Sequence, residues 1–297
     1  KEVFDLFSLR GTTLVAVGAQ DSAGVLMNLS DGTIVATLGD ARAVTTGFAL
    51  SHDGRSLICG GMGGSVMCYD LSTGSARALC AIPEEMACLG LAYSPDDATV
   101  ALSFFSDKGV EESALVRIVN AATGKMLRDL KIPGAPLVFV RFLKNGNQFI
   151  AGRMNGTAAL CESSSGAIVR EFGAETNQTL AFDFDSEQGL LLMPGAEGTL
   201  SLVSVGDGKV VGEFKGDFRF AIRSVFSPDG KRVASCGNDR IVRVWNVAGG
   251  QEIARGPMAR GGEMTGLTFS QDGQYLIHME RDRRLGSWDF QSPRAGS

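Results

Sequence analysis

Hydrophobic and polar residues alternate in short runs along the whole chain, and Gly, Asn and Asp interrupt the runs. The clearest stretch contains four runs, at residues 222–227, 232–236, 241–247 and 251–255. Alternation with a period of two is typical of β-strands, because successive side chains of a strand point to opposite faces. No helical periodicity competes with it, so the sequence predicts an all-β fold built from short strands.

A short turn phrase recurs along the chain: an aromatic residue or leucine, a small polar residue, turn residues and, in most copies, glycine. The phrase, or a degraded copy, ends at residues 11, 54, 97, 146, 189, 230 and 273. A second marker, which is tryptophan in its clearest copies, falls at residues 27, 69, 119, 161, 203, 245 and 288. Both markers repeat about every 42 residues, with one longer step in the same repeat. About 42 residues holding four short strands is the size of one propeller blade.

The repeat predicts a single domain, a seven-bladed β-propeller of four-stranded antiparallel blades. The repeats are approximately residues 3–40, 41–80, 81–131, 132–172, 173–215, 216–256 and 257–297. The third repeat has about eight extra residues, which we place in a polar, mobile loop at residues 106–113.

The two ends of the chain bear on how the ring closes. Pro293 and Gly296 disfavour a strand in residues 291–297, so we expect the last blade to have three strands in this chain. The chain starts at Lys1 and not at Met. We therefore expect it to come from a longer protein whose preceding residues cover the open edge at residues 285–290.

The sixth and seventh repeats carry a family resemblance. Ser227-Pro228-Asp229-Gly230, then Val233-Ala234-Ser235, then Val244-Trp245-Asn246, resembles a WD repeat. The match is strong in these two repeats, weaker but in register elsewhere, and covers nearly the whole chain. The resemblance implies a structural tetrad of Asp, His, Ser and Trp. It assigns structural roles to these five residues: Ser235, Asp239, Trp245, Asp282 and Trp288. The tetrad is incomplete, because the histidine position falls near Phe218 in the sixth repeat and His278 replaces the serine in the seventh.

The resemblance also implies a docking surface. In this family, partners usually bind the top face, formed by the loops between second and third strands and the loops between consecutive blades. We therefore expect a protein or peptide partner there. Exposed arginines and phenylalanines are typical anchors of such interfaces. The candidates are Arg42, Phe105, Arg153, Phe218, Arg219, Arg240, Arg260, Arg281 and Arg284.

Charge on the predicted top-face loops is uneven. The loops of the third to fifth repeats are acidic overall, and those of the sixth and seventh are basic. One interpretation is that these two regions of opposite charge steer a protein partner onto the top face. The alternative is ordinary surface charge.

Composition excludes several other functions. The net charge of −5 argues against a general nucleic-acid binder, and no apolar run approaches the roughly 20 residues of a membrane span. With 2 histidines and no Cys-x-x-Cys pair, a metal site is not expected. Neither a nucleophile motif nor a nucleotide fingerprint is present, so we predict no cofactor and a non-catalytic scaffold. The alternatives are a propeller hydrolase or quinone-cofactor dehydrogenase with residues converging on the central channel, or a structural domain of a longer chain.

The 6 cysteines bear on the compartment. Cysteines within strands behave as small apolar residues, which favours a reducing, cytoplasmic location. Their even number leaves disulfides open. Cys80 and Cys88 flank one loop and are the best candidates for a bridge, whereas Cys59 and Cys68 should point to opposite faces of their strands.

Overall fold

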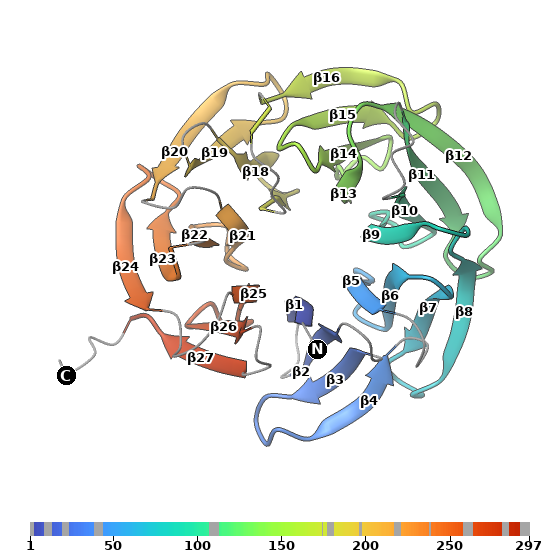
Figure 1. Cartoon of the computed structure of the whole chain (residues 1–297), viewed down its shortest axis with the longest axis horizontal. Coiled ribbons are helices and arrows are strands. Elements are labelled where there is room, and N and C mark those ends of the chain that lie inside the picture. The colour runs from blue at the N-terminus through green and yellow to red at the C-terminus, as the bar shows by residue number, and fades with distance from the viewer. Residues whose placement is uncertain are drawn as a thin grey trace.

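The computed structural model describes residues 3–8, 14–19, 24–38, 44–106, 113–173, 175–176, 181–195, 198–216, 221–237, 239–257, 264–280 and 285–291. These residues form 27 β-strands and no α-helix. Every strand pairs antiparallel with the next one in its sheet, and the sheets stand around a central axis as in a propeller (Figure 1).

Five of the sheets are small. The first contains β1 (Val3–Ser8), β2 (Leu14–Ala19), β3 (Gly24–Asn28) and β4 (Ile34–Leu38). The next contains β13 (Leu137–Phe142), β14 (Gln148–Arg153), β15 (Ala158–Glu162) and β16 (Ile168–Phe172). It is followed by β17 (Asp183–Asp185), β18 (Leu190–Pro194), β19 (Thr199–Ser204) and β20 (Val210–Lys215). Then come β21 (Ala221–Phe226), β22 (Arg232–Gly237), β23 (Ile241–Asn246) and β24 (Glu252–Pro257). The last contains β25 (Met264–Phe269), β26 (Tyr275–Glu280) and β27 (Leu285–Asp289).

The remaining sheet has eight strands. It contains β5 (Val44–Leu50), β6 (Ser56–Met62), β7 (Ser65–Asp70), β8 (Ala76–Ala81), β9 (Ala87–Tyr93), β10 (Thr99–Phe105), β11 (Ser113–Asn120) and β12 (Met126–Pro133). One pair of residues, Met62 of β6 and Ala87 of β9, joins its two halves. The all-β propeller arrangement is thus confirmed, but the described strands form six sheets and not seven separate blades.

We use "strand group" for a set of strands that pair in chain order. The groups are β1–β4, β5–β8, β9–β12, β13–β16, β17–β20, β21–β24 and β25–β27. Trp245 lies on the third strand of its group and Trp288 on the third strand of the last, as the repeat predicts. Residues 107–112 of the predicted loop and residues 292–297 lie outside the described residues.

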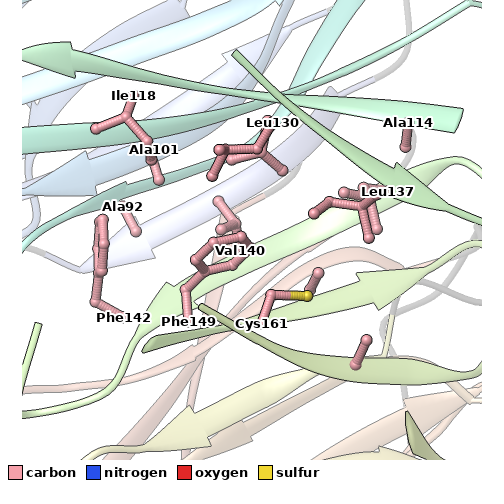
Figure 2. Packing of buried hydrophobic residues seen from close by; sticks show 14 residues of the cluster. Ala92, Ala101, Ala114, Ile118, Leu130, Leu137, Val140, Phe142, Phe149 and Cys161 are labelled. Carbon is pink, nitrogen blue, oxygen red and sulfur yellow. The ribbon is translucent and has the colours of Figure 1, made fainter. Parts of the chain in front are cut away.

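Apolar side chains fill the space between neighbouring strand groups. Figure 2 shows one such cluster, in which Ala101 and Ile118 of β10 and β11 face Val140 and Phe149 of β13 and β14. The ring closes in the same way, because Val15 of β2 packs with Ile277 of β26. Burying these faces against each other is the main favourable term in folding.

The recurring turn phrase forms a tight turn between the first two strands of a group. Gly146, Gly230 and Gly273 end it with φ of 66–68°, a left-handed conformation that glycine adopts without steric cost. Asp97 takes the same position with φ of 55°. Its carboxylate accepts hydrogen bonds from the backbone amides of His52 (2.8 Å) and Asp53 (3.0 Å) in the neighbouring turn. Asp97 therefore ties two neighbouring turns together.

Cys80 and Cys88, the best candidates for a bridge, are not joined, since all six cysteines are described and all are thiols. The thiol of Cys88 is fully buried, and its sulfur would lie 3.2 Å from a Cβ at Gly60, so it packs over the bare backbone of β6. Burial raises the pKa of Cys59, Cys161 and Cys236 to about 12, because the thiolate would lose its hydration. These thiols act as core residues.

Candidate functional site

The top face of the ring is formed by two kinds of connection. Because strands in a group alternate in direction, the loops between second and third strands lie at the same end as the loops between groups. The predicted structural and partner-binding residues fall into two sets. The first set lies outside the described residues and contains Arg42, Phe218, Arg219, Arg260, Arg281, Asp282 and Arg284. The second set is described and contains Phe105, Arg153, Ser235, Asp239, Arg240, Trp245 and Trp288.

Trp245 and Ser235 form the core of the sixth repeat. Trp245 Nε1 donates a hydrogen bond of 2.9 Å to Ser235 Oγ, and both side chains are buried. The indole ring also packs on Phe214 of β20, with ring centroids 5.8 Å apart. This contact joins two strand groups, β17–β20 and β21–β24.

Asp239 stands in the turn between β22 and β23. Its Oδ1 accepts a hydrogen bond from the backbone amide of Ile241 (3.2 Å), and its Oδ2 lies 2.6 Å from Arg243 Nη1. The Arg243 side chain is 0% exposed, and its Nε lies 3.6 Å from Glu252 Oε2. A charge buried this deeply requires compensation by its neighbours. Arg243 was missed at the sequence level, although its alternation with Trp245 places it on the same, buried face of β23.

Arg240 follows Asp239 in that turn and is exposed. Its φ of 62° is left-handed, and its amide donates to the carbonyl of Gly237 (3.2 Å). The ion pair with the buried Arg243 holds Asp239, the residue that precedes Arg240. Arg240 therefore lies on the top face, in a turn that is held by the ion pair of Asp239 with Arg243.

Arg153 differs from the exposed anchor that we expected. Its side chain is buried, and it binds both carboxylate oxygens of Glu171, at 2.7 and 3.1 Å, and the carbonyl of Pro133 at 3.1 Å. Gly134, with φ of 105°, leaves the space that this guanidinium occupies. Arg153 thus holds β14, β16 and the end of β12 together.

Phe105 ends β10 at the top face and is half-buried. Its neighbour Phe104 is buried under Arg117, whose Cζ lies 5.6 Å from the ring centroid. Arg117 also binds Asp129 through Nε (2.8 Å) and Nη2 (2.9 Å), which lowers the pKa of Asp129. The residue before Phe105 is therefore held in place by packing and by the contacts of Arg117.

Trp288 joins the last two strand groups. Its ring lies over Gly256 of β24, where an added Cβ would come within 3.0 Å of it. It also packs against Phe290, with ring centroids 6.1 Å apart. Glycine at position 256 is therefore needed for this close approach.

The described residues contain no group of three or more His, Cys, Asp or Glu residues arranged to hold a metal ion. Asp183 is a buried carboxyl on β17, and loss of hydration raises its pKa. Its carboxylate accepts hydrogen bonds from the amides of Phe226 (2.7 Å) and Phe184 (2.9 Å). Asp183 therefore links β17 to β21.

Three arginines that the sequence analysis missed connect neighbouring strand groups at the outer edge. Arg77 Nη2 donates to the carbonyl of Ala121 (2.6 Å), and Arg128 Nη1 donates to that of Ser163 (3.0 Å). Arg170 Nη1 donates to the carbonyls of Val205 (3.0 Å) and Gly206 (2.6 Å). We call these contacts the arginine clasps. Their signal in the sequence is an arginine eight or nine residues after the second marker in three successive repeats.

Sheets in a propeller arrangement, with a buried tryptophan bonded to a serine on the adjacent strand, are similar to a WD-repeat β-propeller. The WD40 family model, described as "WD domain, G-beta repeat", matches residues 208–246, which include β20 to β23. The chain therefore carries a WD40 repeat, and the resemblance to WD-repeat proteins is confirmed.

Several curated proteins are similar to most of the chain. Cilia- and flagella-associated protein 52 of Sus scrofa is 21% identical over 255 residues, which cover 83% of this chain and 39% of that protein. The Homo sapiens protein of the same name is 20% identical over 252 residues, covering 82% and 38%. Autophagy-related protein 16 of Arabidopsis thaliana is 22% identical over 250 residues, covering 80% and 46%. The chain thus matches less than half the length of each of these relatives.

Among the described residues, no helix is long and apolar enough to cross a membrane.

Proposed function

We propose that the chain is a non-catalytic scaffold, a seven-bladed propeller that binds a protein or peptide partner on its top face. In this proposal each predicted repeat supplies one blade. The eight-stranded sheet then counts as two blades, β5–β8 and β9–β12, since a single pair of residues joins them. Relatives named for association with cilia and flagella fit a chain whose role is to associate with other proteins. Six cysteine thiols favour a reducing, cytoplasmic location.

The observation that carries the proposal is the fixed presentation of Arg240. A residue whose backbone is already fixed loses less conformational entropy when a partner binds. Across the ring, the described top-face loops expose Glu84, Glu85 and Glu175. A top face with an arginine on one side and carboxylates on the other supports recognition of a partner with the complementary charge pattern.

Charge reversal on the top face tests the proposal. The variant Arg240→Glu is combined with Arg219→Glu, Arg260→Glu and Arg281→Glu, and partner capture is measured by affinity purification with quantitative mass spectrometry. We expect the proteins enriched by the wild-type chain to fall about fivefold or more. The control is Arg55→Glu, which changes an exposed arginine in the turn between β5 and β6, on the opposite face. Equal loss with this control, or full capture by the top-face variant at low salt, would contradict a top-face site.

A further inference from the structure

A groove of about 370 Å³ lies between the strand groups β13–β16 and β17–β20. It is lined by residues in or beside the turns β13–β14, β17–β18 and β19–β20, and by β15 and β16. These turns connect first to second and third to fourth strands, so they lie on the face opposite the top face. In Figure 1 the two strand groups are neighbours, and β16 and β20 form their outer edges.

The walls of the groove are mostly apolar. Leu143, Leu160 and Val205 line it, and Val169 contributes an aliphatic side chain that is 50% exposed. Gly189 and Gly206 add bare backbone, and no atom lies within 4 Å of the place where either would carry a Cβ. The groove can therefore accept an aliphatic or aromatic side chain of a partner.

Arg170 is the charged residue among those that line this groove. Hydrogen bonds from its Nη1 hold the side chain in place. Nη1 is engaged by the carbonyls of Val205 and Gly206, which belong to the neighbouring strand group. Within the described residues, Nε and Nη2 have no hydrogen-bond partner, and the side chain of Arg170 is only partly buried. The guanidinium is thus oriented by one nitrogen while its Nε–Nη2 edge remains available.

Elsewhere in the chain, the same edge of a guanidinium binds carboxylates. Arg117 uses Nε and Nη2 to hold both oxygens of Asp129, at 2.8 and 2.9 Å. Arg255 holds both oxygens of Glu252 in the same way, at 2.6 and 3.0 Å. Two parallel, charge-assisted hydrogen bonds are the strongest contact that arginine makes with a carboxylate.

We propose that this groove is a second binding site, for a peptide segment that places an apolar side chain next to a carboxylate. The apolar side chain enters between Leu143, Val169 and Val205, and the carboxylate pairs with the Nε–Nη2 edge of Arg170. Gln148 also lines the groove, and because its Nε2 donates to Glu162, its Oε1 can accept an amide of the peptide. A positive lining residue beside an apolar surface selects an acidic, apolar peptide over a basic one.

Two variants test binding in the groove separately from the stability of the fold. Gly206→Leu fills the groove while the carbonyl of residue 206 can still accept the hydrogen bond from Arg170. No atom lies within 4 Å of a Cβ at this position, and the position needs no left-handed backbone. Arg170→Gln removes the guanidinium. The matched control is Arg128→Gln, which removes the corresponding clasp at the preceding pair of strand groups. Among the described residues, Arg128 bonds the carbonyl of Ser163 and no other group. Thermal unfolding of each variant, followed by circular dichroism, is the check that the ring is still folded.

The probe is the capped peptide acetyl-Gly-Leu-Glu-Gly-amide, compared with its Gln analogue by saturation-transfer NMR on the intact chain at up to about 5 mM peptide. We expect the Glu peptide to bind about fivefold more tightly than the Gln peptide. Binding should disappear in Gly206→Leu, weaken to the level of the Gln peptide in Arg170→Gln, and persist in Arg128→Gln. No binding by the wild-type chain, equal binding of the two peptides, or binding that survives Gly206→Leu would overturn the proposal. Because the top face is unchanged in these variants, partner capture there is tested independently.

Discussion

Two sides of the ring hold neighbouring strand groups together by different means. On one side the arginine clasps reach from β8, β12 and β16 to carbonyls of the next strand group. The corresponding positions on β20, β24 and β4 are Gly212, Ala254 and Ala36, whose side chains are too short to reach across. On that side, tryptophan contacts join the groups, with Trp245 on Phe214 and Trp288 over Gly256. Away from the outer edge, Arg232 Nη1 also donates to the carbonyl of Gly273 there (2.9 Å).

The difference shows that a propeller repeat can be stabilised either at its outer edge or in its interior. The repeats with tryptophan are the ones that resemble the family most clearly, and they lack the clasp. The repeats with arginine have Tyr69, Val119 and Cys161 in the tryptophan position. A clasp contributes about 1 kcal/mol, as expected of a partly solvated hydrogen bond, whereas a buried tryptophan contributes several.

The largest effect should come from the tryptophan side. Trp245→Ala removes a ring that is 3% exposed and leaves Ser235 without its donor. We expect it to lower the free energy of unfolding by about 4 kcal/mol, measured by urea denaturation. Trp245→Phe should cost clearly less, because it keeps the contact with Phe214. A loss below about 1.5 kcal/mol for the alanine variant would contradict the comparison.

Removing the buried charge on the same side should cost slightly less. Arg243→Met leaves the carboxylate of Asp239 beside an apolar side chain, and we expect a loss of about 3 kcal/mol in unfolding free energy. Adding Asp239→Asn should recover part of this loss, because the second variant removes the unpaired charge. If the two substitutions were additive, the two side chains would not be coupled in the folded chain.

On the arginine side, breaking one clasp should have a modest effect. Arg128→Ala removes a hydrogen bond of 3.0 Å from an exposed guanidinium to the carbonyl of Ser163. We expect a loss of about 1 kcal/mol, measured by the same urea denaturation. A loss comparable to that of Trp245→Ala would mean that the clasps dominate, and the proposed division of the ring would fail.

The smallest effect comes from transferring a clasp to the other side. Gly212→Arg should place a guanidinium near the carbonyl of Val247, which occupies the position of Val205 in the next repeat. A Cβ at position 212 makes only ordinary contacts with Leu202, at 3.6 Å. Gly212→Ala is the control for the loss of glycine flexibility. We expect the arginine variant to be about 0.5 kcal/mol more stable than the alanine variant, and a less stable arginine variant would exclude a transferable clasp.

Features that depend on local chemistry could be predicted from the sequence. The turn phrase requires a left-handed residue, and Gly146 and Gly230 occupy that conformation. The repeat placed Trp245 on the third strand, and the family resemblance implied its hydrogen bond with Ser235. These predictions succeed because a turn or a strand face is set by a few neighbouring residues.

Features that depend on backbone partners could not be predicted. The arginine clasps end on carbonyl groups, which every residue carries, so no partner residue type marks them. The pair of Met62 and Ala87 is likewise made by the backbone. The spacing of Cys80 and Cys88 left a bridge open, because spacing along the chain does not say that one sulfur packs over Gly60.

The junction of Met62 with Ala87 has a consequence for how the ring opens. Because this single pair links β6 to β9, these two strands should exchange their amide hydrogens for deuterium at closely matched rates. The outer strands β8 and β12 should exchange independently of each other. Hydrogen exchange followed by mass spectrometry would then show matched protection at the junction and separate protection in the rest of the two strand groups.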